Sequence, residues 1–83
     1  MITTNQELYD VVGDLMNALR KAGEPNLSEG LHSALSISTL PGEVLGEIRL
    51  QLERVKGSRP YDQIHIRRAV DEAIRYINGA LGS

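Results

Sequence analysis

Apolar residues recur at helical spacing in four segments of the chain. The longest of these stripes consists of Ile66, Val70, Ala73, Ile74, Ile77 and Leu81. Its members stand mostly three or four positions apart, whereas Arg68, Glu72 and Arg75 project toward the other side of a helix. Pro60 suits a first helical turn, where a backbone N–H would have no partner in any case. The pattern predicts a helix over residues 60–81 that needs partner helices to cover its apolar side.

A second stripe follows a helix-start signal near the beginning of the chain. Thr4 and Glu7 have the spacing of a capping box, in which the hydroxyl and the carboxylate each accept a backbone N–H at the helix start. The apolar positions that follow are Leu8, Val11, Val12, Leu15, Leu19 and Ala22. Gly23 suits a C-terminal cap, so we predict a helix over residues 5–22. Gly13 lies off the stripe, where it either admits a close neighbour or leaves slack.

Two shorter stripes lie between these segments. The first consists of Leu27, Leu31, Ala34 and Leu35, and the second of Val44, Leu45, Ile48, Leu52 and Val55. They predict a short helix over residues 27–36 and a longer one over residues 41–56. Pro41 suits the first turn of the longer helix, and Gly57 suits its end. Residues 36–40, rich in serine and β-branched side chains, can instead be briefly extended.

Four amphipathic helices with short connections predict an all-α fold. We expect a small antiparallel four-helix bundle with a short second helix, built as a single helical domain over residues 1–83. In this arrangement the first, third and fourth helices form the main bundle, and the second closes one end.

Two apolar residues lie outside the stripes. At 100° per residue, Leu50 points roughly opposite Leu52, so the third helix is apolar on two sides. Either this helix is covered on both sides within the chain, or Leu50 contacts another molecule. Ile64 likewise lies off the stripe of the fourth helix, in the first turns, where projected geometry is least certain.

Composition narrows the class of protein. The 83 residues include no cysteine, no tryptophan and no phenylalanine, so the core must use Leu, Ile, Val and Ala with help from three tyrosines. The absence of cysteine excludes disulfides and thiolate metal sites. The first residues lack the basic and apolar regions of a signal peptide, and no segment approaches the roughly 20 apolar residues of a membrane span. We therefore expect no membrane partner and a cytoplasmic location.

No residue pattern points to catalysis, a cofactor or a metal. His32 and His65 are the only histidines, and neither has a second ligand type at a spacing typical of metal sites. Asp62 could act with His65 as an acid–base pair, although both fit ordinary surface positions. The serines have no base or acid at a spacing that would support a hydrolase triad. We expect a protein that is not an enzyme and that binds no cofactor.

Charge is uneven along the chain, whose net charge is −2. Residues 1–47 include seven acidic and two basic residues, whereas residues 48–83 include four acidic and seven basic ones. A candidate acidic docking face on the first helix consists of Glu7, Asp10 and Asp14. It could attract a basic partner or simply be a solvated helix face. A candidate basic surface consists of Arg54, Lys56, Arg59, Arg67 and Arg68.

Two features argue against nucleic-acid binding by this basic surface. The third helix, which would be the recognition helix of a helix-turn-helix arrangement, carries Glu43 and Glu47 where phosphates and bases would lie. Acids also lie four residues from several arginines, which predicts the ion pairs Arg49–Glu53, Arg67–Asp71, Arg68–Glu72 and Arg75–Asp71. Such pairs would leave less positive charge to bind phosphates.

The function that this sequence favours is a noncatalytic protein–protein interaction module that associates with another protein or with itself as a homodimer. Its candidate interface consists of Leu50, Ile64, Tyr61, Tyr9 and Met16. Apolar and aromatic side chains left on a surface are typical of interface cores. One alternative is an immunity or inhibitor protein that offers its acidic helix face to a basic toxin or enzyme. Another is a small nucleic-acid-associated regulator.

Overall fold

The computed structural model describes residues 1–82, and within them it contains four α-helices and no strand. Their bounds are Asn5–Lys21 for α1, Pro25–Leu35 for α2, Pro41–Lys56 for α3 and Ile64–Ala80 for α4. A 3-10 turn, η1, spans Arg59–Asp62. The predicted all-α bundle with a short second helix is confirmed. Ser83, the last residue of the predicted domain, lies outside the described residues.

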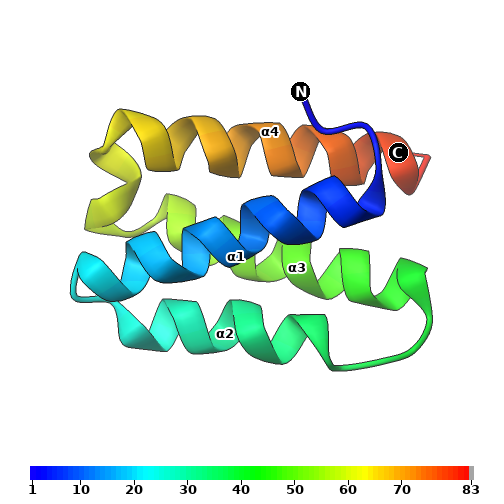
Figure 1. Ribbon diagram of the computed structural model, residues 1–83, viewed down its shortest axis with the longest axis horizontal. Helices are drawn as coiled ribbons and strands as arrows, with labels where there is room; N and C mark the ends of the chain where they lie inside the picture. The colour runs from blue at the N-terminus through cyan, green and yellow to red at the C-terminus, as the bar shows by residue number, and fades with distance from the viewer. Residues whose placement is uncertain (83) are drawn as a thin grey trace.

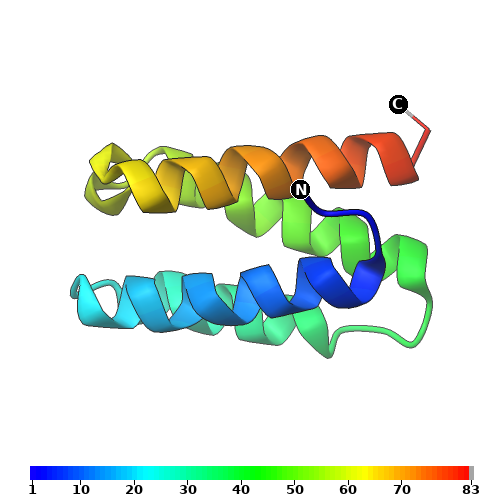
Figure 2. The same ribbon diagram turned by 45° about the horizontal axis from the view of Figure 1, so that its top comes forward.

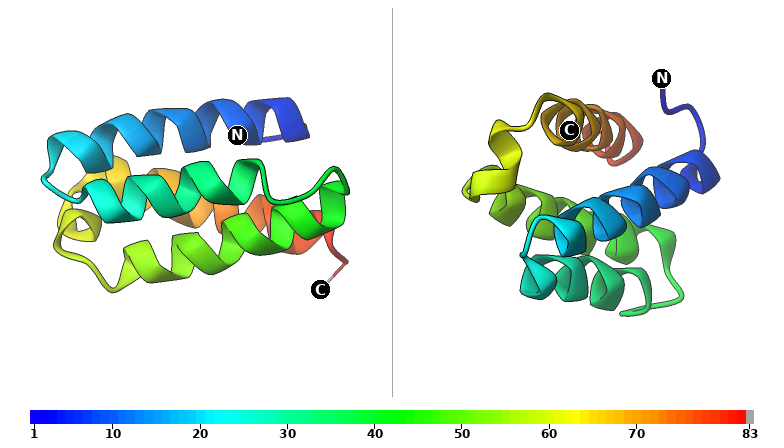
Figure 3. Two further views of the ribbon diagram at one scale, coloured as in Figure 1. Left: turned by 90° about the horizontal axis from the view of Figure 1, so that it is seen from below. Right: turned by 60° about the vertical axis from the view of Figure 1, so that its left-hand side comes forward.

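Consecutive helices run antiparallel (Figure 1). Each helix packs on the next one, and α4 packs on α1, so the four helices form a closed ring. The expectation that the second helix closes one end is wrong, because α2 lies lengthwise beside α1 and α3 (Figures 1 and 3). The short connections at residues 22–24 and 36–40 explain this placement, since short loops make consecutive helices antiparallel neighbours.

The core consists of the apolar stripes, as predicted. The buried apolar side chains are Ile2, Leu8, Val12, Leu15, Leu19, Leu31, Ala34, Val44, Leu45, Ile48, Leu52, Val55, Ile66, Val70, Ala73 and Ile77. The stripe members Ala22 and Leu81 are exposed, and each is the C-cap of its helix, just after the last helical residue. Ile2, which precedes the first helix, is a core residue that the helical pattern did not include.

Local signals set both ends of α1. The Glu7 N–H donates to Thr4 Oγ1 at 3.1 Å, as the capping box predicts. At the other end Gly23 has φ +83°, and the Glu24 N–H donates to the Leu19 carbonyl at 2.9 Å. A left-handed glycine with this hydrogen bond is a Schellman cap, which stops the helix at Lys21. A Cβ added at Gly13 would meet nothing within 4 Å, so no neighbouring group packs closely against this glycine.

The predicted start of the fourth helix at Pro60 is wrong. The chain forms η1 there, turns extended at Gln63 (φ −74°, ψ 127°), and begins α4 at Ile64. Pro60 is buried and Tyr61 packs against the core. Because proline suits the first turn of a 3-10 helix as well as that of an α-helix, its local signal did not distinguish the two.

No helix within residues 1–82 is both long enough and apolar enough to cross a membrane.

Candidate protein-interaction site

Leu50 lies on the side of α3 that faces away from the bundle. Its side chain is 58 % exposed, whereas Ile48 and Leu52 on either side of it are completely buried. α3 packs against α2 and α4, and Figure 2 shows it between α4 and the pair formed by α1 and α2. The chain therefore does not cover Leu50, and its role as an interface residue stays a prediction.

The residues around Leu50 are small or charged. We call the side of α3 that carries Gly46, Glu47, Leu50, Glu53 and Arg54 the outer face. These residues stand three or four positions from Leu50 and therefore border it on the helix surface. A Cβ added at Gly46 would meet nothing within 4 Å, so the chain leaves open space beside Leu50.

The charged groups of the outer face have no oppositely charged partner in the described part of the chain. Arg54 Nη1 donates a hydrogen bond to Gln51 Oε1 at 3.1 Å, but this amide oxygen carries no charge. The ion pairs within residues 1–82 join the Met1 ammonium to Glu72 and Arg67 to Asp62. Glu47 and Arg54 therefore both remain able to form an ion pair with another molecule.

Ile64 is the other exposed member of the predicted interface. It is the first residue of α4 and is 58 % exposed. Leu50 lies in the middle of α3, whereas Ile64 lies near η1 at the end of the bundle. Ile37 and Leu40, in the connection between α2 and α3, are exposed to a similar extent, and the apolar pattern of the sequence did not identify them. An isolated loop residue gives no periodic signal that could have identified them.

The three remaining candidates have contacts within the chain. The Tyr61 hydroxyl donates to Asp71 Oδ1 at 2.7 Å, and the Arg67 guanidinium lies 5.4 Å from the centre of the Tyr61 ring. The hydrogen bond to Asp71 raises the pKa of Tyr61 above its ordinary value. Tyr9 and Met16 lie on α1, where both pack partly buried against the core. Of the predicted set, Leu50 and Ile64 offer the most apolar surface.

A shallow groove between α1 and α4 was not predicted. It has a volume of about 230 Å³, and its lining includes Val11, Ala18 and Ala69. Asp14 and His65 also lie beside it. Small side chains at the edges of both stripes leave room for this groove. They could predict it only if α1 and α4 were already known to be neighbours.

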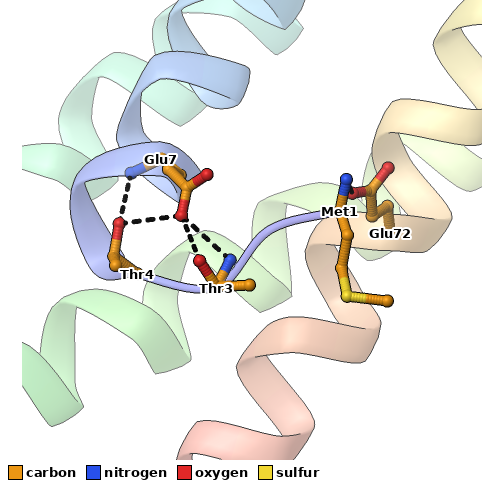
Figure 4. A network of polar contacts seen from close by, with 5 residues as sticks. All are labelled: Met1, Thr3, Thr4, Glu7 and Glu72. Atoms are coloured by element: carbon orange, nitrogen blue, oxygen red, sulfur yellow. Dashed lines mark hydrogen bonds and ion pairs between the residues drawn. The ribbon is translucent and has the colours of Figure 1, made fainter.

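The acidic docking face is largely engaged at the start of α1. The Glu7 carboxylate accepts the Thr3 N–H at 3.1 Å and also binds the Thr3 and Thr4 hydroxyls (Figure 4). These hydrogen bonds, led by that of the Thr3 hydroxyl, lower the pKa of Glu7 below its ordinary value. Asp10 accepts a hydrogen bond from Gln6 Nε2 at 3.1 Å.

The predicted ion pairs on α3 and α4 are wrong. Asp71 accepts the Tyr61 hydroxyl, Glu72 pairs with the Met1 ammonium at 3.1 Å (Figure 4), and Arg49 donates to Asn78 Oδ1 at 2.7 Å. Partners that are distant in sequence have replaced the neighbours four residues away. All five residues of the candidate basic surface are exposed: Arg54, Lys56, Arg59, Arg67 and Arg68. Of these, Arg67 approaches a carboxylate, Asp62 Oδ1, at 3.9 Å.

The histidines lie apart on the surface. His32 is exposed on α2 and His65 is exposed on α4. Within the described part of the chain, no three His, Cys, Asp or Glu residues come together in an arrangement that could hold a metal ion.

Comparison of the chain with protein-family models, with curated proteins and with solved structures finds no match.

Proposed function

We propose that this protein is a noncatalytic protein-interaction module whose contact surface centres on Leu50. The observation that carries the proposal is the position of this side chain, which is 58 % exposed in the middle of a helix whose other side is buried. A single exposed leucine is common on protein surfaces and would not by itself indicate a partner. The open space at Gly46 and the unpaired charges of Glu47 and Arg54 add the shape and the polarity that a specific contact needs.

Photo-crosslinking from position 50 tests this proposal. Leu50 is replaced by benzoylphenylalanine in the full chain, and the protein is illuminated in cells of its source. We expect a covalent adduct from position 50 and none from the same replacement at Glu29, which is exposed on α2 and serves as the matched control. Equal labelling at both positions, or no adduct at position 50, would overturn the proposal.

A second candidate function is binding of a phosphate-rich polymer such as RNA. It is favoured by the failure of the predicted ion pairs, which leaves Arg68 and Arg75 exposed and outside the ion pairs of the described residues. Both line a shallow depression on α4 together with Arg67, although Asp71 and Glu72 lie there too. Binding of labelled RNA that weakens steeply with salt, and that Arg68→Ala reduces, would support this function. No binding at low salt would remove it.

A further inference from the structure

We infer that the partner of the outer face is a second copy of this chain, bound so that the two α3 helices run antiparallel with Leu50 against Leu50. The inference rests on the proposed function, because it identifies what binds at the Leu50 surface. It is carried by the arrangement of charge around Leu50, which complements itself under a two-fold rotation.

The positions of Glu47 and Arg54 provide the complementarity. At 100° per residue, both project to the same side of Leu50 on the helix surface. Measured along the helix axis, Glu47 lies about 4.5 Å from Leu50 toward the start of α3, and Arg54 lies about 6 Å from Leu50 toward the end. A two-fold axis at Leu50 reverses the helix direction and keeps each residue on its side. Glu47 therefore meets Arg54 of the partner subunit, and the same ion pair forms a second time by symmetry.

On the other side of Leu50, the antiparallel arrangement brings no like charges together. Glu53 projects to that side, and the two-fold axis places it opposite Gly46 of the partner subunit. Gly46 has no side chain and has open space above it, so the contact can be close and brings no like charge. A parallel pairing about a two-fold axis exchanges the two sides of Leu50, so Glu47 would face Gly46 of the partner subunit and Arg54 would face Glu53 of the partner subunit. Glu47 forms an ion pair across the axis in the antiparallel arrangement and not in the parallel one, so a charge reversal at Glu47 distinguishes the two.

The dimer should be weak and reversible. A standard interface buries about 800 Å² on each partner. The proposed contact has one large apolar side chain at its centre and charged side chains around it, and ion pairs at a protein surface contribute little affinity. We therefore expect dilution to dissociate the dimer, with a dissociation constant in the micromolar range or above.

Charge reversal tests the pairing directly. In sedimentation equilibrium of the full chain, Glu47→Arg and Arg54→Glu should each weaken self-association about tenfold or more, because each variant opposes like charges across the axis. An equimolar mixture of the two variants should associate again, since the mixed dimer pairs arginine with glutamate on both sides. Glu29→Arg, a charge reversal on α2 of the same kind, should leave the association unchanged.

Circular dichroism of each variant ensures that the comparison is between folded proteins. Single variants that associate like the wild type, or a mixture that fails to associate, would overturn the antiparallel pairing. A wild-type chain that stays monomeric up to millimolar concentration would overturn the dimer itself. In that case an adduct between position 50 and a different protein would still support the proposed function, whereas the lack of any specific adduct at position 50 would overturn that function too.

Discussion

Leu50 and Leu52 stand two residues apart on α3, yet the first is 58 % exposed and the second is completely buried. Truncation of an exposed leucine changes the free energy of unfolding by less than about 0.5 kcal/mol. Truncation of a buried one loses transfer free energy and leaves a cavity, at about 2–5 kcal/mol. We therefore expect Leu50→Ala to unfold like the wild type and Leu52→Ala to be strongly destabilised. Urea denaturation at a protein concentration low enough to keep the chain monomeric measures both.

The same pair of variants checks the position of Leu50 independently of any partner. A loss of 2 kcal/mol or more in Leu50→Ala would mean that Leu50 is packed within the monomer. The helical period predicted that the two leucines point apart, but it could not predict whether a neighbouring helix covers the second side. That depends on which helices adjoin α3, and α2 and α4 both lie on its inner side.

At the scale of the element, the start of α1 depends on the ionised carboxylate of Glu7. Hydrogen bonds from Thr3 and Thr4 lower the pKa of this group below its ordinary value in the folded chain. Because the folded-state pKa is depressed, the resulting stabilisation is present above the unfolded-state pKa and is lost as the pH falls through the folded-state value. We expect Glu7→Gln to be less stable than the wild type at pH 7 and to approach its stability as the pH falls through the folded-state pKa of Glu7.

Urea denaturation of both proteins at pH 7 and in acid measures this convergence. Glu29→Gln is the matched control, because the side chain of Glu29 forms no hydrogen bond or ion pair with the described residues. A destabilisation by Glu7→Gln that is equal at both pH values would mean that the charge of Glu7 does not support the cap.

Elements whose signals are local were predicted well. The bounds of α3 agree with the prediction, and Thr4 with Glu7 and Gly23 identified the ends of α1 to within one residue. The start of α4 was missed because Pro60 is compatible with two kinds of helix, and the packing of Tyr61 against the core decides between them. The ion pairs four residues apart were missed for a related reason. Asp71, Glu72 and Arg49 each bind a partner that lies outside their own helix.

At the scale of the whole molecule, α1 and α4 close the ring of helices and join the two ends of the sequence. Figure 1 shows the chain before α1 running beside α4. Ile2 in this segment is 8 % exposed, and the Tyr76 hydroxyl of α4 donates to Asn5 Oδ1 across the same seam. These contacts span nearly the entire sequence, so no local pattern could predict them. The seam is also where the bundle lacks a covalent connection between neighbouring helices.

The seam should therefore be the most easily opened boundary of the bundle. Tyr76→Phe removes one partly buried hydrogen bond and should lower the free energy of unfolding by about 1 kcal/mol. Because the loss lies between the first and last helices, we expect faster amide hydrogen exchange in α1 and α4 than in α2 and α3, relative to the wild type. Hydrogen exchange followed by NMR measures the two pairs of helices in one sample. If exchange rose equally in all four helices, the ring would open only by unfolding as a whole, and the seam would be no weaker than the boundaries that loops connect.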